Sequence, residues 1–228
     1  MSELSNLLFD ILPLAFGAAV SPTVLIGIIL ILSISDRPKL SGIAFYVGSI
    51  VILLVVATAG ILLGKGVAVA SSKPPSVTSA YIDLAIGIFL ILLGIWRINK
   101  KGSDAPDKNR FGGKSKSTVS DFIKYMILGL GMFTVNFTTT VLVFAAGKDI
   151  GISSAGITDK ITVVIVLTLI TLLVVEIPLL VDFVMPKRSE KVLGVLNVRM
   201  QKNSRYLMAA VMFVFGIYLM VKGVRVLF

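Results

Sequence analysis

The sequence contains no cysteine and no histidine among its 228 residues. Without thiols, the chain has neither disulfide bonds nor thiol redox chemistry, and Cys/His metal sites are excluded. Without imidazole, Ser-His triads and histidine proton relays are excluded as well. Charged residues make up only 15%, against roughly 25% in soluble domains. We therefore expect no enzyme, no cofactor and no metal site.

What the sequence does contain is apolar residues, which make up 56% of it, with a mean hydropathy of +0.98. A bilayer core of about 30 Å takes roughly 20 apolar residues per helix. Charged clusters divide the chain into six apolar segments that are long enough to span. They run over residues 7–32, 43–63, 80–98, 123–146, 161–185 and 206–228. These segments predict an all-α, polytopic membrane protein with six transmembrane helices.

The basic residues predict how the chain lies in the membrane. Lys and Arg number 22 against 12 Asp and Glu, for a net charge of +10. Sixteen of the 22 belong to the first, third and fifth connections or to the helix ends beside them. The other six are Lys65, Lys73, Lys148, Lys160, Lys222 and Arg225. Because cytoplasmic loops carry the excess of Lys and Arg, both termini are predicted to be extracytoplasmic in a plasma-membrane protein, and the charge gives no support to a nucleic-acid partner.

A basic, polar connection separates the chain into three predicted parts. Residues 1–98 form the first three-helix repeat, residues 99–122 a basic cytoplasmic connection that we expect to be mobile, and residues 123–228 the second repeat. The connection contains Gly113-Lys114-Ser115 but lacks the first glycine of a phosphate-binding loop. No nucleotide site is therefore predicted.

Weak internal similarity supports two repeats. Gly94-Ile95-Trp96 in the third segment corresponds to Gly216-Ile217-Tyr218 in the sixth. Val20-Ser21-Pro22-Thr23 in the first corresponds to Val135-Asn136-Phe137-Thr138 in the fourth. Because three spans is an odd number, the two repeats would have opposite topology, which is a transporter architecture.

Polar residues near the middle of the first and fourth segments predict a binding site between broken helices. Pro22 removes a backbone donor and frees a carbonyl that lipid cannot satisfy. Polar side chains flank Pro22 and occur at the corresponding place in the fourth segment. The predicted substrate-binding residues are Ser21, Pro22, Thr23, Asn136, Thr138 and Thr139. The alternative is that Pro22 only kinks its helix and that the threonines bond carbonyls one turn earlier.

Glu176 is the single carboxylate deep inside an apolar run, two residues before Pro178, where a second helix break is predicted. A carboxylate in hydrocarbon is costly unless it is paired, hydrated or protonated. We therefore predict that Glu176 is the proton-coupling residue, and the alternative is a protonated carboxyl group that bonds a neighbouring helix. Asp10, Asp83 and Asp182 lie nearer segment ends, where we expect solvation by water; a cation shared by Asp10 and Asp83 is left open.

Three groups of short motifs lie at residues 16–22 (FGAAVSP), 136–139 (NFTT) with 145–147 (AAG), and 175–178 (VEIP) with 185–186 (MP). They resemble those of the GAP family, the peptidoglycolipid- and sulfolipid-addressing proteins of the lysine-exporter (LysE-type) superfamily. The resemblance extends from about Leu12 to Gly223. It implies six spans in two inverted three-helix halves and the export or display of a polar lipid or small solute.

The fourth-span motif departs from the family pattern, Asn-Pro-Lys-Asn, of which only Asn136 is kept. The lost proline and lysine would remove a helix break and a cation from the implied site, while Glu176 adds an acid. The charges therefore favour a cationic or zwitterionic substrate, or proton coupling through Glu176.

The prediction for function is a secondary transporter that exports a small polar solute or polar lipid by alternating access, with membrane lipids as partners. The alternatives are a passive channel and a structural or partner-dependent lipid-display protein without coupled transport. Small residues such as Gly87, Gly94, Gly129 and Gly131 are candidates for close helix packing within the chain or in a homo-oligomer.

Overall fold

The computed structural model describes residues 3–70, 77–99 and 118–227, and this part of the chain is built from helices. Most of the predicted mobile connection, residues 100–117, lies outside the described residues, and its last residues belong to a helix. The helices are α1 (Glu3–Ala19), α2 (Pro22–Ile34), α3 (Pro38–Ala70), α4 (Val77–Asn99), α6 (Thr118–Val135), α7 (Phe137–Ile152), α8 (Ile157–Val184) and α9 (Pro186–Leu227).

The predicted set of membrane-spanning helices is confirmed. Five helices are long and apolar enough to cross a membrane: α3, α4, α6, α8 and the part of α9 from Met200. The pair α1–α2, bent by 55°, forms a sixth candidate span. The fourth apolar segment is also divided, because α6 ends at Val135 and α7 begins at Phe137.

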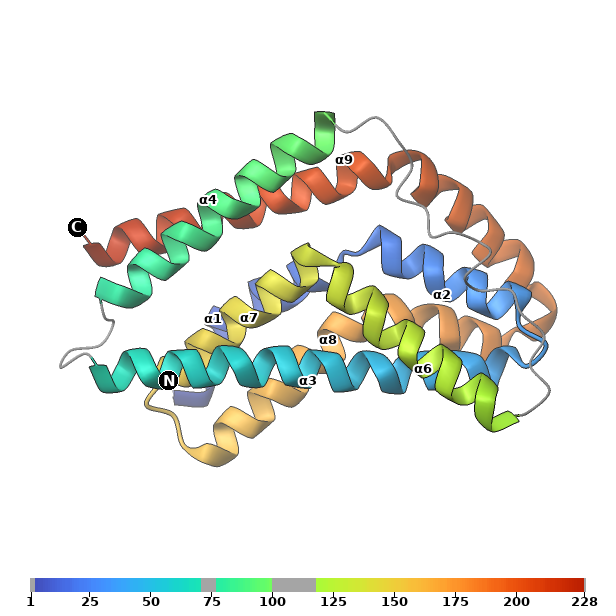
Figure 1. Cartoon of the computed structure of the whole chain (residues 1–228), viewed down its shortest axis with the longest axis horizontal. Coiled ribbons are helices and arrows are strands. Elements are labelled where there is room, and N and C mark those ends of the chain that lie inside the picture. The colour runs from blue at the N-terminus through green and yellow to red at the C-terminus, as the bar shows by residue number, and fades with distance from the viewer. Residues whose placement is uncertain (1–2, 71–76, 100–117, 228) are drawn as a thin grey trace.

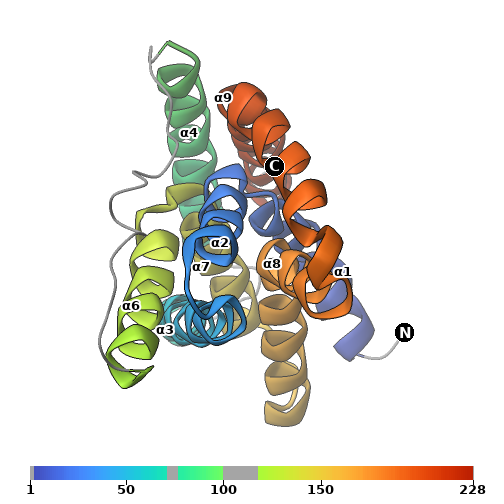
Figure 2. The same cartoon turned by 90° about the vertical axis from the view of Figure 1, so that its right-hand side faces the viewer.

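The helices pack across the boundary between the two predicted repeats. In Figure 1, α3 lies along α6 and α7, α8 lies beside α1, and α4 lies beside the C-terminal part of α9. Both chain ends are on the left of this view, and Figure 2 shows α4 and α9 standing together at one side of the molecule. Each predicted repeat therefore has its principal contacts with the other one.

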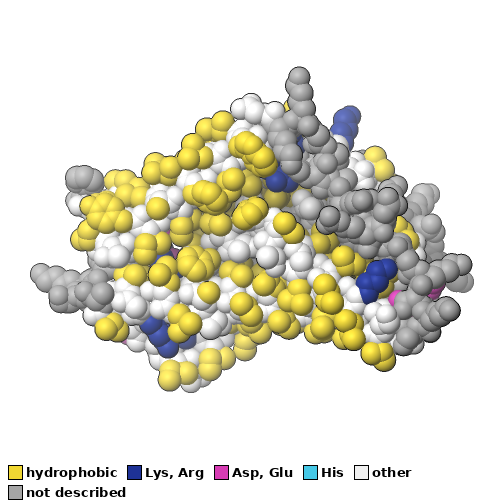
Figure 3. Space-filling view, in the orientation of Figure 1, with side chains coloured by type: hydrophobic (Ala, Val, Ile, Leu, Met, Phe, Trp, Pro, Cys, Tyr) yellow, Lys and Arg dark blue, Asp and Glu magenta, His cyan; other side chains and the backbone are white. Residues whose placement is uncertain are grey.

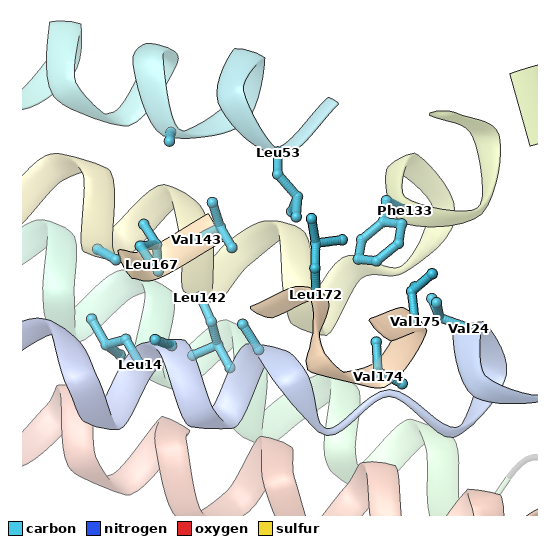
Figure 4. Packing of buried hydrophobic residues seen from close by; sticks show 14 of the residues in the cluster. Leu14, Val24, Leu53, Phe133, Leu142, Val143, Leu167, Leu172, Val174 and Val175 are labelled. Atoms are coloured by element: carbon cyan, nitrogen blue, oxygen red, sulfur yellow. The ribbon is translucent and has the colours of Figure 1, made fainter. Parts of the chain in front are cut away.

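The apolar core lies where α1, α2, α3, α6, α7 and α8 meet. Leu14, Leu53, Phe133, Leu142 and Leu172 belong to this buried cluster (Figure 4). The outer faces are apolar as well, and hydrophobic side chains are spread over the face that Figure 3 displays. An apolar exterior around an apolar core is the arrangement expected of helices surrounded by lipid.

Glycines bring some helix pairs into close backbone contact. A Cβ atom at Gly87 of α4 would lie 2.7 Å from the carbonyl oxygen of Gly216 on α9. Gly129 lies against the Phe45 carbonyl, and Gly94 packs on Met212. A Cβ atom added at Gly131 would have no neighbour within 4 Å. Three of the four candidate glycines therefore serve packing within the chain, and a homo-oligomer stays a prediction.

The predicted helix break at Pro178 is wrong, since α8 continues through this residue to Val184. A proline removes one backbone donor but does not by itself end a membrane helix, because neighbouring groups can satisfy the carbonyl that it frees. A helix does begin at Pro22, where the preceding residue, Ser21, caps it.

Candidate functional site

The break between α1 and α2 is made by Ser21 and Pro22. Pro22 stands at the first position of α2, where its fixed φ suits a helix start. The Ser21 hydroxyl caps α2 by accepting a hydrogen bond from the Val24 amide at 3.3 Å. In a continuous helix the amide of residue 22 would donate to the Ala18 carbonyl, and proline has no such amide. That carbonyl instead accepts a hydrogen bond from the Thr139 hydroxyl on α7, at 2.9 Å.

The break between α6 and α7 lies at Asn136, although the proline of the family motif is missing. The expectation that losing this proline removes the break is therefore wrong. Asn136 stands at the N-cap position of α7, and its backbone amide still donates to the Met132 carbonyl of α6 at 3.1 Å. The Thr140 hydroxyl donates to the Phe133 carbonyl at 2.8 Å, so a hydroxyl serves a carbonyl at this break too.

The two breaks contact one another directly, and we call Ser21, Asn136 and Thr139 the junction. The side-chain amide of Asn136 donates to the Ser21 hydroxyl at 2.5 Å and to the Thr139 hydroxyl at 2.9 Å. All three side chains are at least 95% buried. Residues 115 positions apart thus join the middle of the first span to the middle of the fourth.

Next to the junction is a cavity of about 250 Å³, the junction pocket, between α2, α4, the α6–α7 break and α9. The Asn136 side-chain oxygen and the Thr138 hydroxyl are buried and have no hydrogen-bond partner. Arg97 adds a guanidinium to the pocket wall. The predicted residue Thr23 lines it too, together with Leu93, Trp96, Met132, Val135, Phe137, Met208 and Met212.

The remaining predicted binding residues lie on the other side of the junction. Ser21 and Pro22 line a mostly apolar hollow of about 350 Å³ between α1, α2, α8 and α9. The predicted residues are therefore brought together around one point, but three of them line one cavity, two line the other, and Thr139 lines neither. The alternative, in which the threonines bond carbonyls one turn earlier, does not hold for Thr138 and Thr139, because Thr139 bonds a carbonyl of α1 and Thr138 bonds none.

A family model for Sap, the sulfolipid-1-addressing protein, matches residues 11–225. The chain belongs to this family. Both breaks, the junction and the junction pocket lie inside the matched range. The comparisons found no curated protein and no solved structure that matches the chain. With its apolar helices, this Sap-family chain is a multi-pass membrane protein.

Glu176, the predicted proton-coupling residue, bonds a residue outside the junction in this Sap-family chain. Its carboxylate accepts a hydrogen bond of 2.7 Å from the Tyr46 hydroxyl on α3. Both side chains are half-buried. Tyr46 is in the first third of α3 and Glu176 in the last third of α8, so the pair lies toward the α2–α3 and α8–α9 connections.

A second polar region, which we call the charged cluster, consists of Asp83, Lys148, Asp149 and Lys222. Lys148 of α7 is completely buried and bonds the carboxylate of Asp83 on α4, and its ammonium also donates to Ser79 at 3.0 Å. Asp149 lies 3.3 Å from Lys148 and 2.5 Å from Lys222 on α9. The cluster thus connects α4, α7 and α9.

The charged cluster corrects two expectations from the sequence. Asp83 is 3% exposed and paired, so it is not solvated by water. Lys148 is not a surface charge, because α7 extends six residues past the predicted end of the segment at Ala146. Outside the cluster, Asp182 is buried too, so the expectation that water solvates it is also wrong, whereas Asp10 is exposed as expected. The missed signal was the adjacent pair Lys148-Asp149 directly after the apolar run, which a longer helix places inside the protein.

The charged cluster borders a cavity of about 460 Å³ to which Asp10, Asp83, Asp149 and Lys222 all contribute. Asp10 and Asp83 thus face the same cavity, but the Asp83 carboxylate is already paired with Lys148. Within the part of the chain that the structure describes, no group of three or more carboxylates is arranged to hold a metal ion.

Proposed function

We propose that this chain is a carrier, not an enzyme, and that it moves a polar lipid whose headgroup binds in the junction pocket. The observation that carries the proposal is the pair of buried, unpartnered oxygens on Asn136 and Thr138, two residues that line this cavity. Leaving a polar group buried without a partner costs about 1–3 kcal/mol. A ligand that bonds these groups relieves this cost.

The chemistry of the pocket wall supports one class of headgroup. The Asn136 oxygen only accepts hydrogen bonds, the Thr138 hydroxyl both donates and accepts, and the Arg97 guanidinium only donates. The complementary ligand carries a hydroxyl group close to an anionic oxygen. A sulfated or otherwise anionic sugar fits this description, in agreement with the family's name. The loss of the lysine from the fourth-span motif argued against an anionic substrate. Arg97 supplies a cation in place of that lysine.

The rim of the junction pocket supports entry from the lipid phase. Trp96, Val135 and Phe137 line the pocket and are each more than half exposed. In a membrane these side chains face lipid, so a headgroup can reach the polar wall while its chains stay in an apolar environment. Met132, Met208 and Met212 add flexible apolar walls that adapt to ligands of different shape.

The junction also supports alternating access. Broken helices that meet near the middle of a bilayer are the usual site of substrate binding in inverted-repeat transporters. The hydrogen bond between Asn136 and Ser21 joins the two predicted repeats, so their relative motion would change the shape of the pocket. The Tyr46–Glu176 bond connects α3 to α8, also across the repeats, and supports Glu176 as the group that exchanges a proton during this motion.

The test is transbilayer movement of a fluorescent sulfated lipid in proteoliposomes. Purified protein is reconstituted with NBD-labelled sulfatide, and dithionite quenches the label in the outer leaflet only. About half of the label starts in the outer leaflet. With the wild type we expect more than this half to be quenched, because lipid from the inner leaflet moves outward. Thr138→Val should slow movement about two- to tenfold, and Arg97→Gln, which removes a charge-assisted bond, by at least about tenfold.

Thr134→Val is the matched control, because the Thr134 hydroxyl bonds the Leu130 carbonyl within α6 and is exposed. It should move the probe at the wild-type rate. Equal rates for wild type, Thr138→Val and Arg97→Gln would contradict the site. Probe that co-purifies with the protein but does not cross the bilayer would contradict the carrier mechanism and favour lipid display.

A further inference from the structure

A second cavity is lined by α4 and α7, two of the helices that also line the junction pocket. It has a volume of about 430 Å³ and lies between α3, α4 and α7. We call it the seam groove. Its lining is Val55, Val56 and Ala59 of α3, Ala85, Ile86 and Phe89 of α4, and Thr140, Val141 and Phe144 of α7.

The seam groove continues the junction pocket turn by turn. On α4, Leu93 lines the junction pocket and Phe89, one turn away, lines the groove. On α7, Phe137 lines the pocket and Val141, one turn on, lines the groove. From Arg97 to Phe89 the distance along α4 is about 12 Å. The linings of the two cavities therefore follow one another along α4 and α7, and we call the two cavities together the path.

The two ends of this path differ in polarity. The groove lining includes a single polar residue, Thr140, whose hydroxyl is already bonded to the Phe133 carbonyl at 2.8 Å. The groove thus offers no free hydrogen-bonding side chain, whereas the junction pocket offers the Asn136 oxygen and the Thr138 hydroxyl. Such a path, polar at one end and apolar at the other, matches an amphiphile.

The two ends of the path lie at different places along α4. Arg97 lies in the last turn of α4, near the end of its span. Ala85 to Phe89 lie at the middle of α4, and Val55 to Ala59 lie near the middle of α3. Along α4 the groove residues are therefore nearer the middle of the helix than Arg97 is, while Asn136 and Thr138 of the junction pocket lie at the α6–α7 break.

We infer that the seam groove between α3, α4 and α7 binds an acyl chain of the lipid whose headgroup occupies the junction pocket. This inference rests on the proposed function and specifies where the apolar part of the substrate lies. Two alanines, Ala59 and Ala85, leave the space that the chain fills. The groove is open toward lipid, because Val55 and Phe89 on its border are 58% and 45% exposed. A chain can enter it sideways.

The experiment is photo-cross-linking in proteoliposomes with a sulfatide that carries a diazirine at the end of its acyl chain. Mass spectrometry of the digested protein locates the cross-links. We expect them to concentrate in peptides that contain residues 55–59, 85–89 and 140–144. Arg97→Gln should reduce these cross-links at least about fivefold, since the headgroup holds the chain in place; lipid bound non-specifically would be insensitive to this change.

Filling the groove gives a second, independent result. Ala59→Phe and Ala85→Phe should each remove most cross-links from the groove. Ala210→Phe is the control, because Ala210 is exposed on α9 and lines none of the described cavities; it should leave the pattern unchanged. Size-exclusion profiles identify variants that fail to fold, and the Arg97→Gln result does not depend on them.

The outcomes separate this inference from the proposed function. Cross-links that are spread evenly over exposed helix faces, or that persist in Arg97→Gln, would overturn the acyl-chain site even if NBD-sulfatide crosses the bilayer. Headgroup-dependent cross-links in the groove without transbilayer movement would support the acyl-chain site and contradict the carrier. Cross-links between two copies of the chain at this groove would overturn the inference in favour of a dimer interface.

Discussion

The junction and the charged cluster both place polar side chains between membrane-spanning helices, but they differ in how these groups are satisfied. In the charged cluster, every charge has an opposite charge within 3.3 Å. The junction carries no charge, and the side-chain oxygens of Asn136 within it and of the neighbouring Thr138 have no partners, although both residues line a cavity. A fully paired cluster holds helices together, while unpartnered groups next to a cavity are available to a ligand. The comparison thus separates a paired, structural region from the region for which we propose ligand binding.

The largest expected effect on stability is that of Lys148→Met, which leaves the Asp83 carboxylate buried without its cation. Breaking a buried ion pair in this way costs about 3–5 kcal/mol. We expect a strongly reduced yield of folded protein and a lower unfolding temperature in detergent, measured by fluorescence-detected size exclusion after heating. Lys148→Met combined with Asp83→Leu removes both charges and should recover most of the loss. A single variant as stable as the wild type would refute a structural role for the cluster.

A smaller effect is expected at the junction itself. Asn136→Leu removes the donor that bonds Ser21 and Thr139, which should lower the free energy of unfolding by about 1–3 kcal/mol. Ser21→Ala removes a helix cap and should cost about 1 kcal/mol. Because the two side chains share a hydrogen bond, their effects should not add, with a coupling of at least about 0.5 kcal/mol in a double-mutant cycle. Additive effects would show that the bond contributes nothing.

Tyr46→Phe should have a weaker effect, about 1 kcal/mol, because it removes one hydrogen bond from a half-buried carboxylate. Glu176→Gln should be better tolerated in folding, since the amide oxygen can still accept the Tyr46 hydroxyl. If Glu176 exchanges a proton, the Gln variant loses the dependence of sulfatide movement on an imposed pH gradient. The same gradient dependence in wild type and Glu176→Gln would remove its coupling role.

The smallest effect on stability is expected for Thr138→Val. The Thr138 hydroxyl is buried without a partner, so replacing it by a methyl group of similar shape should change the free energy of unfolding by less than about 0.5 kcal/mol, or raise it. Its effect on sulfatide movement should nevertheless be clear. A large loss of stability in this variant would mean that the hydroxyl has a structural partner and would weaken the binding role of the junction.

The spans and the first break could be predicted because they depend on local chemistry. Apolar length specifies where a helix can cross a bilayer. Ser21 followed by Pro22 is a strong signal for a helix start, whatever surrounds it. The polar residues around Asn136 also predicted a break in the fourth segment, although the loss of the family's proline argued against it. The pairing of the two halves by weak internal similarity stays a prediction.

What could not be predicted depends on contacts between distant residues. Whether Lys148 is a loop charge or a buried ion depends on Asp83, which lies 65 residues earlier. Arg97 was counted as a topology signal, and only the packing of α4 beside the α6–α7 break turns it toward a cavity. At Pro178 the prediction failed in the opposite way. Proline is a strong local signal for a helix break, but α8 continues through it.

The charged cluster also has a consequence for how the chain is assembled in the membrane. During synthesis α4 enters first with Asp83, then α7 with Lys148 and Asp149, and α9 brings Lys222 only when the chain is nearly complete. Each charged helix is unfavourable in lipid until its partner arrives, by about 2.5–3.5 kcal/mol per charge on insertion scales. A chain that stops before α9 still pairs Lys148 but leaves one carboxylate in excess. Such a product lacks the ion pair between Asp149 and Lys222, and we expect membrane quality control to degrade it.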